Sequence, residues 1–296
     1  MKRGLSALLA IVCSAVAVAQ QVPESVYALP DLPSADAVDG AGQVHFGLGV
    51  SYFTDYVYRG VEFFQIPGRE DNPNFQVDAK LSFDLGKLPH PYVSVFTNAA
   101  DSDPVNSFEE IRPQAGFDWP IKPLVFSAGY TAYLYPDREE LQTNEVFFRV
   151  AFDEKTLYHG EPIPTPYLLA AYDFDKYDGF YLEAGVKYRV PIDELGITLT
   201  GVASVAYVSG YRAYLGDTAD IPGFFTTAAT DGDRVDGFQH YQLGLIGQYS
   251  ISKLFDIPSR FGDFSLRGYL FYTDGMSNDP AATSELWGGA SINLEF

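Results

Sequence analysis

Apolar and polar residues alternate with a period of two over most of the chain after residue 42. From Phe75 to Asp84, every second residue is apolar, and polar residues such as Asp78 and Lys80 stand between them. Because successive side chains of a strand point to opposite faces, this alternation predicts strands with one apolar and one polar face. The runs have about nine to twelve residues, the length that a tilted strand needs to cross the hydrocarbon core of a membrane.

The pattern predicts about twelve antiparallel strands, an even number as in single-chain bacterial barrels. Three of them, 91–99, 165–175 and 197–209, mix apolar residues on both faces, but β-branched and aromatic residues dominate them and turn signals bound them. The expected strands are 43–53, 75–84, 91–99, 110–119, 124–135, 145–153, 165–175, 180–190, 197–209, 237–250, 264–273 and 285–296.

The connections between these runs fall into two classes. Residues 85–90, 120–123, 191–195 and 251–262 are mostly short and contain proline, whereas residues 54–74, 136–142, 210–236 and 274–283 are polar and often long. Membrane barrels have short periplasmic turns and longer external loops. A soluble β-sandwich would also alternate, but aromatic residues cluster at both strand ends, which favours a transmembrane β-barrel.

The first 42 residues differ from the rest. Lys2 and Arg3 precede a short apolar run and the small residues of Ala17-Val18-Ala19, which predicts a signal peptide over 1–19. Cys13 as a lipoprotein site is a weaker alternative, because the residues before it match that signal poorly. Residues 20–42 contain three prolines and no periodicity, so we expect a disordered periplasmic linker and a barrel domain over 43–296.

The composition of the chain argues against several classes of function. The net charge of −20 argues against nucleic acid as a partner, since phosphate binding requires clustered Lys and Arg. Removal of the signal peptide would take away the only cysteine, so we expect no disulfide, thiol nucleophile or thiolate metal site. Apart from the signal peptide, no run approaches the roughly 18 apolar residues of a transmembrane helix. We therefore expect an all-β protein with no cofactor.

Two segments resemble known outer-membrane proteins. The chain ends in SINLEF, an alternating strand that ends at Phe296 and is similar to the terminal strand that such proteins present to the barrel assembly machinery. Residues 50–65, VSYFTDYVYRGVEFFQ, resemble the "SDYVFRG" segment of TorF-type porins, a family of outer-membrane β-barrels. Asp55 to Gly60 carry the match, with Thr54 and Tyr58 where the family has Ser and Phe. The resemblance implies an outer-membrane pore of undefined substrate and carries no functional residue over.

The polar face of the strands supplies the candidate site. Both signs of charge occur there without the uninterrupted ladder of a strongly selective channel, and Arg59, Asp231 and Asp233 are expected in an external vestibule. The expected channel-lining residues are Asp78, Lys80, Arg112, Gln114, Glu145, Arg149, Glu183, Lys187 and Arg267.

Enzymatic and metal-binding alternatives have less support. His240 lies near an external strand end, but Gln242 stands where a lipase serine would be needed. Asp231, Asp233 and Asp236 lie close to His240 in the sequence, so an outer-membrane protease site is one alternative. Residues 231–237 could also offer oxygens to Ca²⁺, although they lack the spacing of an EF-hand.

The sequence therefore predicts a non-enzymatic channel in a bacterial-type outer membrane. Its expected partners are membrane lipid and small hydrophilic solutes. A closed structural or adhesive barrel, or an outer-membrane hydrolase, remains the alternative.

Overall fold

A computed structural model describes residues 42–62, 73–100, 109–136, 139–153, 163–212, 234–276 and 284–296. The expected signal peptide and all of the expected linker except Gly42 lie outside these ranges. The elements are β1 (Val44–Phe53), β2 (Val57–Tyr58), β3 (Val61–Glu62), β4 (Asn74–Phe83), β5 (His90–Ala100), β6 (Glu110–Ile121), β7 (Leu124–Tyr133), η2 (Glu139–Leu141), β8 (Thr143–Phe152), β9 (Thr165–Asp173), β10 (Gly179–Ile192), η3 (Asp193–Leu195), β11 (Ile197–Arg212), β12 (Arg234–Ser250), α3 (Ile251–Leu254), η4 (Ser259–Phe261), β13 (Asp263–Gly275) and β14 (Glu285–Glu295).

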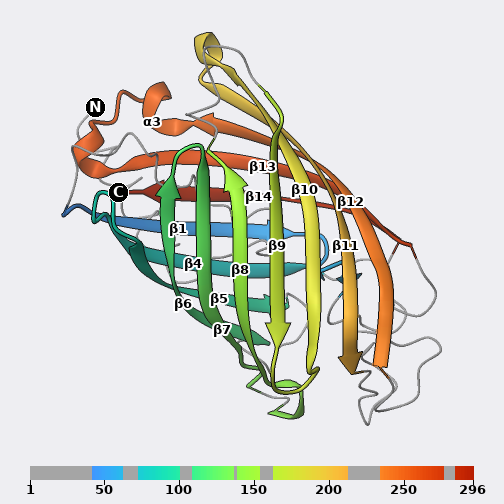
Figure 1. The fold of residues 1–296 in the computed structure, drawn as a ribbon. Helices are drawn as coiled ribbons and strands as arrows, with labels where there is room; N and C mark the ends of the chain where they lie inside the picture. Colours follow the sequence, from blue (N-terminus) through green and yellow to red (C-terminus); the bar gives the residue numbers. More distant parts are fainter. Residues whose placement is uncertain are drawn as a thin grey trace.

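Twelve strands close into one antiparallel barrel (Figure 1). Each strand pairs with its neighbours in sequence, and β1 pairs with both β4 and β14, so no sheet edge is left in this ring. All twelve expected strands are confirmed, including the three whose alternation was mixed. Between β11 and β12 the register shifts twice, next to Tyr207 and next to Tyr211, as at a β-bulge. No helix among the described residues is long and apolar enough to cross a membrane.

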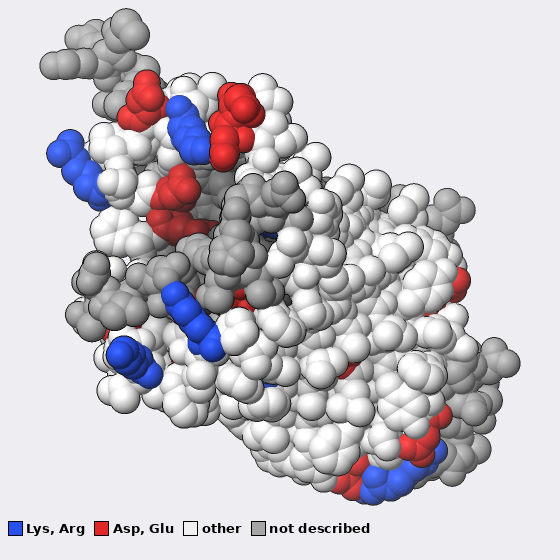
Figure 2. Space-filling model, turned by 45° about the horizontal axis from the view of Figure 1, so that its top comes forward, with Lys and Arg blue, Asp and Glu red and all other residues white. Residues whose placement is uncertain are grey.

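The outward face of the barrel is apolar. Phe148, Leu182 and Leu270 stand at alternate positions of their strands and are between 41% and 53% exposed. Figure 2 shows charged side chains gathered toward two ends of the molecule and a broad band of uncharged residues between them. An apolar exterior band between polar ends is the surface of a transmembrane barrel, because lipid tails offer no hydrogen bonds.

Aromatic residues mark both borders of this band. At one border the rings of Tyr52 and Phe75 lie 4.8 Å apart. At the other, the indole Nε1 of Trp119 donates to the backbone oxygen of Lys87 at 3.2 Å. An aromatic side chain with an apolar body and a polar tip suits the level of the lipid headgroups. The aromatic girdles expected from the sequence therefore have exposed members at both borders.

The two ends of the barrel differ. We call one the turn end, because it carries the connections 84–89, 122–123 and 193–196, the segment 251–262 and the C-terminus, which Figure 1 shows beside α3. We call the other the loop end, because the expected external loops leave from it. The last strand is fastened at the turn end, where Phe296 and Phe46 exchange two backbone hydrogen bonds of 2.7 and 2.8 Å.

The interior is packed near the loop end. A cluster of buried side chains, mostly aromatic, spans the inside of the barrel there and draws on the wall strands and on the segment after β1. Tyr56, Tyr58 and Val61 of that segment lie in the cluster together with side chains of the wall. Its members are Tyr56, Tyr58, Val61, Phe96, Tyr133, Tyr135, Leu141, Leu169, Ala171, Tyr177, Tyr181, Ala206, Val208, Tyr211 and Val235.

A candidate functional site inside the mouth of the barrel

The segment that fills the loop end is a short hairpin made by β2 and β3. Every described residue from Asp55 to Glu62 is buried, and the two strands form a separate two-stranded sheet outside the ladder of the wall. The sequence predicted that residues 54–74 form an external loop. This expectation is wrong for the first part of the segment, which folds into the lumen because its apolar and aromatic side chains find partners there.

The turn of this hairpin is set by two residues. Arg59 and Gly60 have φ of +50° and +77°, and Tyr58 pairs directly with Val61 across them. Positive φ at both central residues makes a type I′ turn, whose twist matches that of the two strands it joins. Gly60 also needs to be glycine for space, since an added Cβ would clash with the ring of His240 on β12. The turn thereby brings the arginine to the tip of the hairpin.

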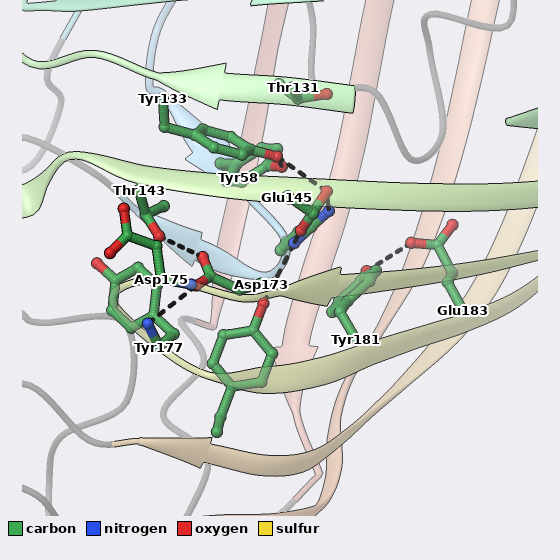
Figure 3. A network of polar contacts seen from close by, with 12 residues as sticks. Tyr58, Thr131, Tyr133, Thr143, Glu145, Asp173, Asp175, Tyr177, Tyr181 and Glu183 are labelled. Carbon is green, nitrogen blue, oxygen red and sulfur yellow. Dashed lines mark hydrogen bonds and ion pairs between the residues drawn. The ribbon is translucent and has the colours of Figure 1, made fainter. Parts of the chain in front are cut away.

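Arg59 is fastened to the wall of the barrel by a two-pronged ion pair. Its Nη1 donates to Glu145 Oε2 at 2.6 Å and its Nη2 to Glu145 Oε1 at 2.8 Å. The guanidinium lies 4.3 Å from the ring centre of Tyr181, and Nη1 is 3.4 Å from the hydroxyl of Tyr211. Figure 3 shows the Tyr133 hydroxyl directed at Glu145 and the Tyr181 hydroxyl directed at Glu183. Hydrogen bonds between charged groups are stronger than those between neutral groups, and a bidentate arginine–carboxylate pair makes two of them at once.

A second set of contacts holds the first strand of the hairpin. Tyr56 donates its hydroxyl to Glu110 at 2.6 Å and accepts from Arg112 Nη2 at 3.0 Å. The hydroxyls of Tyr58 and Tyr133 lie 2.7 Å apart. Arg112 in turn is paired with Glu110 at 3.0 Å and lies 4.0 Å from the ring centre of Phe96. Two buried arginine–glutamate pairs therefore hold the hairpin. In one, Arg59 of the hairpin pairs with Glu145 of the wall, and in the other, Arg112 and Glu110 both belong to the wall.

The nine expected channel-lining residues all lie on the inward face of their strands, and they divide into two groups. Arg112, Glu145, Arg149 and Glu183 are buried and contact protein groups. Glu183, for example, accepts hydrogen bonds of 2.6 Å from the hydroxyls of Tyr167 and Tyr181. The remaining residues are partly exposed, so they can meet water in the lumen: Asp78, Lys80, Gln114, Lys187 and Arg267.

The expected external vestibule is not assembled as the sequence suggested. Arg59 is only 6% exposed and lies inside the barrel. The type I′ turn places it at the tip of the hairpin, and its ion pair with Glu145 holds it there. Asp231 and Asp233 lie outside the described residues. His240 is buried beneath Gly60 and faces the ring of Tyr181. Among the described residues no group of three or more His, Cys, Asp or Glu side chains is placed to hold a metal ion.

Asp178, in the connection between β9 and β10, ties the loop end together. Its carboxylate accepts from the hydroxyl of Tyr172 at 2.8 Å and from Arg234 Nη2 at 2.6 Å, with Arg212 Nη2 at 3.4 Å. These contacts, the Tyr172 hydrogen bond first, lower the pKa of Asp178. Arg234 also donates to the backbone oxygen of Gly210 at 2.6 Å. One carboxylate therefore connects β9, β10, β11 and β12.

We expect the contribution of this carboxylate to stability to be lost in acid. Because the pKa of Asp178 is lower in the folded state, its stabilisation is present above the ordinary Asp value of about 4 and disappears as the pH falls through the lowered value. Denaturant unfolding in detergent, followed from pH 7 to about pH 2, should show a smaller acid destabilisation for Asp178→Asn than for the parent. Asp256→Asn, at the turn end, is the control and should behave like the parent.

Sequence reasoning missed the inward course of the hairpin, although one signal was present. Val57-Tyr58 and Val61 flank Arg59-Gly60, and β-branched and aromatic residues on both sides of a residue followed by glycine are typical of a two-residue hairpin. Nothing in the local sequence indicates which way such a hairpin folds. The partners that decide it, Glu110, Glu145 and Tyr211, come from three distant strands.

Comparisons with known proteins bear on the fold alone. No family model and no curated protein sequence matches the chain. Among solved structures, an outer membrane channel from Pseudomonas putida F1 superposes with a TM-score of 0.51 and 11% sequence identity, covering 94% of this chain and 100% of that one. The NanC porin has a TM-score of 0.46 with 8% identity over 84% of this chain and 98% of its own. The KdgM porin has a TM-score of 0.45 with 7% identity over 84% of this chain and 99% of its own. The closed ring of twelve strands, together with the superposition on the Pseudomonas putida channel, gives the chain the fold of a transmembrane β-barrel.

Proposed function

We propose that this protein is a channel of the bacterial outer membrane through which small hydrophilic solutes diffuse passively. The observation that carries the proposal is the inward row of charged and polar side chains that stay partly exposed, such as Lys80, Lys187 and Arg267, behind an apolar exterior. Charged side chains within a barrel are expensive to keep unless water or partners reach them. The resemblance of residues 55–60 to TorF-type porins and the fold of the Pseudomonas channel support the same function.

The proposal includes the route by which the protein reaches its membrane. Residues 1–19 would be removed as a signal peptide, and residues 20–42 would remain as a periplasmic linker. The C-terminal strand, with Phe296 63% exposed beside β1, would present its last residue to the barrel assembly machinery. A channel of this kind performs no covalent chemistry and takes no cofactor.

A second candidate is a closed structural or adhesive barrel, and one observation favours it. The hairpin and the aromatic cluster around it fill the loop end, so a solute that enters from the turn end meets buried side chains such as Tyr58 and Tyr181. Conductance of the purified protein in planar bilayers separates the two functions, because a permanently closed barrel passes no ions at any voltage.

In the same bilayers we expect weak cation selectivity at low salt that nearly vanishes at high salt. The inward charges are close to balance, whereas the segments expected outside are rich in Asp and Glu. Their field fades as the Debye length falls from about 30 Å at 0.01 M to about 3 Å at 1 M salt. Reversal potentials under a salt gradient measure the preference.

The charges of the long loops can be tested directly. Asp231→Asn with Asp233→Asn should lower the cation preference at low salt, and Asp193→Asn, in the turn between β10 and β11, should leave it unchanged. Strong anion selectivity at low salt would contradict the expectation and would assign control to the inward arginines.

A further inference from the structure

The wall of the barrel contains a pocket shaped for one chemical group. Glu145 on β8, Tyr181 on β10 and Tyr211 on β11 surround the end of the Arg59 side chain, and all three are at most 2% exposed. Both carboxylate oxygens of Glu145 point at the guanidinium, the ring of Tyr181 lies against it, and the Tyr211 hydroxyl accepts from it. We call these three residues the Glu145 pocket.

The chemistry of the Glu145 pocket selects a guanidinium over an ammonium. Two parallel N–H···O bonds to one carboxylate require a planar group with two donors at a fixed spacing, which a lysine-like ammonium does not offer. A flat, weakly hydrated cation also stacks on an aromatic ring with less loss of solvation than a compact ammonium. The Glu145 pocket therefore selects a cation by its planar shape as well as by its charge.

Contacts within the wall hold the pocket residues in position. Tyr133 donates its hydroxyl to Glu145 Oε1 at 3.2 Å, and Tyr181 donates its hydroxyl to Glu183 Oε2 at 2.6 Å. The rings of Tyr177 and Tyr211 lie 5.8 Å apart. Tyr133, Glu183 and Tyr177 belong to the wall or its connections, so these orienting contacts come from outside the hairpin, although the Tyr133 hydroxyl also contacts Tyr58.

Arg59 uses only part of its side chain in the pocket. The two terminal nitrogens make the hydrogen bonds to Glu145 and Tyr211, whereas Nε is buried and has no hydrogen-bond partner among the described residues. An alkylguanidinium of a free solute offers the same two terminal nitrogens. Everything that the pocket recognises in Arg59 is therefore present in a small molecule of that class.

We propose that the Glu145 pocket is a binding site for guanidinium-bearing solutes and that Arg59 occupies it as a tethered ligand. A solute that takes the place of Arg59 releases the tip of the hairpin and opens the mouth of the barrel. The opening step rests on the proposed channel function, whereas the binding step does not. Because a tethered ligand acts at an effective concentration in the millimolar range, a free competitor needs roughly millimolar concentration or more.

Binding is tested with methylguanidinium on the full-length barrel in detergent, with methylammonium as the matched cation. In Arg59→Ala the pocket is vacated, and roughly 10 mM methylguanidinium should raise the unfolding temperature, at a concentration far below that at which guanidinium salts unfold proteins. Methylammonium should not, and neither cation should do so in the double variant Arg59→Ala, Glu145→Gln. Equal shifts with both cations, a shift that survives in the double variant, or no shift at all would overturn the proposal.

Displacement is tested without removing Arg59. A cysteine introduced by Val61→Cys, at a position 3% exposed, reports whether the hairpin is seated when a membrane-impermeant maleimide is added. Methylguanidinium should speed its labelling at least several-fold, methylammonium should not, and labelling of Lys253→Cys on α3 should be unaffected. If Arg59→Ala fails to fold, this measurement still decides the proposal, since unchanged labelling at Val61→Cys would refute it.

The two proposals fail in different ways. A barrel that never conducts but binds methylguanidinium through Glu145 would refute the channel and keep the site. A barrel that conducts but ignores methylguanidinium would keep the channel and refute the site.

Discussion

Arg59→Ala is expected to raise the ratio of open to closed channels by about two orders of magnitude or more. The substitution leaves the carboxylate of Glu145 buried without its cation, and removing one partner of a buried pair costs about 3–5 kcal/mol. Withdrawal of the hairpin lets water reach Glu145, so the cost falls on the closed state alone. Each 1.4 kcal/mol is about a factor of ten in the equilibrium. Single-channel recording in planar bilayers measures the open fraction directly.

Two further variants make this expectation specific. Glu145→Gln removes the other partner and should also favour the open state, because the guanidinium of Arg59 is then the uncompensated buried charge. Arg260→Ala deletes an exposed arginine at the turn end, outside the lumen, and should leave the open fraction as it is. If the open fraction of Arg59→Ala equals that of the parent, the hairpin does not control the mouth.

Phe148→Arg is expected to destabilise the barrel by about 2–4 kcal/mol, the cost of an arginine on the lipid face near the middle of the membrane. Phe148 is 49% exposed on the outward face of β8, halfway along the strand, and its ring faces that of Phe126 at 6.3 Å. Urea unfolding in lipid vesicles gives the free energy, and loss of the heat-modifiable band on gels reports failed assembly.

The control for this change keeps the position apolar. Phe148→Leu should unfold within about 1.5 kcal/mol of the parent, the limit for mild apolar exchanges, because leucine keeps the position apolar and the half-exposed site leaves no closed cavity. Equal stability of Phe148→Arg and Phe148→Leu would mean that the outward face of β8 does not meet lipid, and the transmembrane assignment would have to be withdrawn.

The strand pattern was readable from the sequence because it is local. The alternation at Phe75–Asp84 has a period that strand geometry fixes. Because a barrel buries one face of each strand in lipid and turns the other inward, the polarity of each residue indicates the face on which it lies. Even 197–209, with apolar residues on both faces, is explained by the structure: Val202, Ala206 and Val208 point inward against the hairpin and the other residues that fill the barrel, and Leu199 points to lipid.

The packing of the hairpin inside the loop end was decided only by the tertiary structure. Nothing near Arg59 in sequence tells that Glu145, 86 residues away, stands opposite it, or that Tyr181 and Tyr211 complete the pocket. An arginine beside a glycine in a polar segment fits an exposed loop as well as a buried turn. The difference is the free energy of a bidentate ion pair and of buried aromatic contacts, which exist only after the strands have closed into a ring. The sequence alone therefore determined the wall of this barrel, and the closed ring decided what fills it.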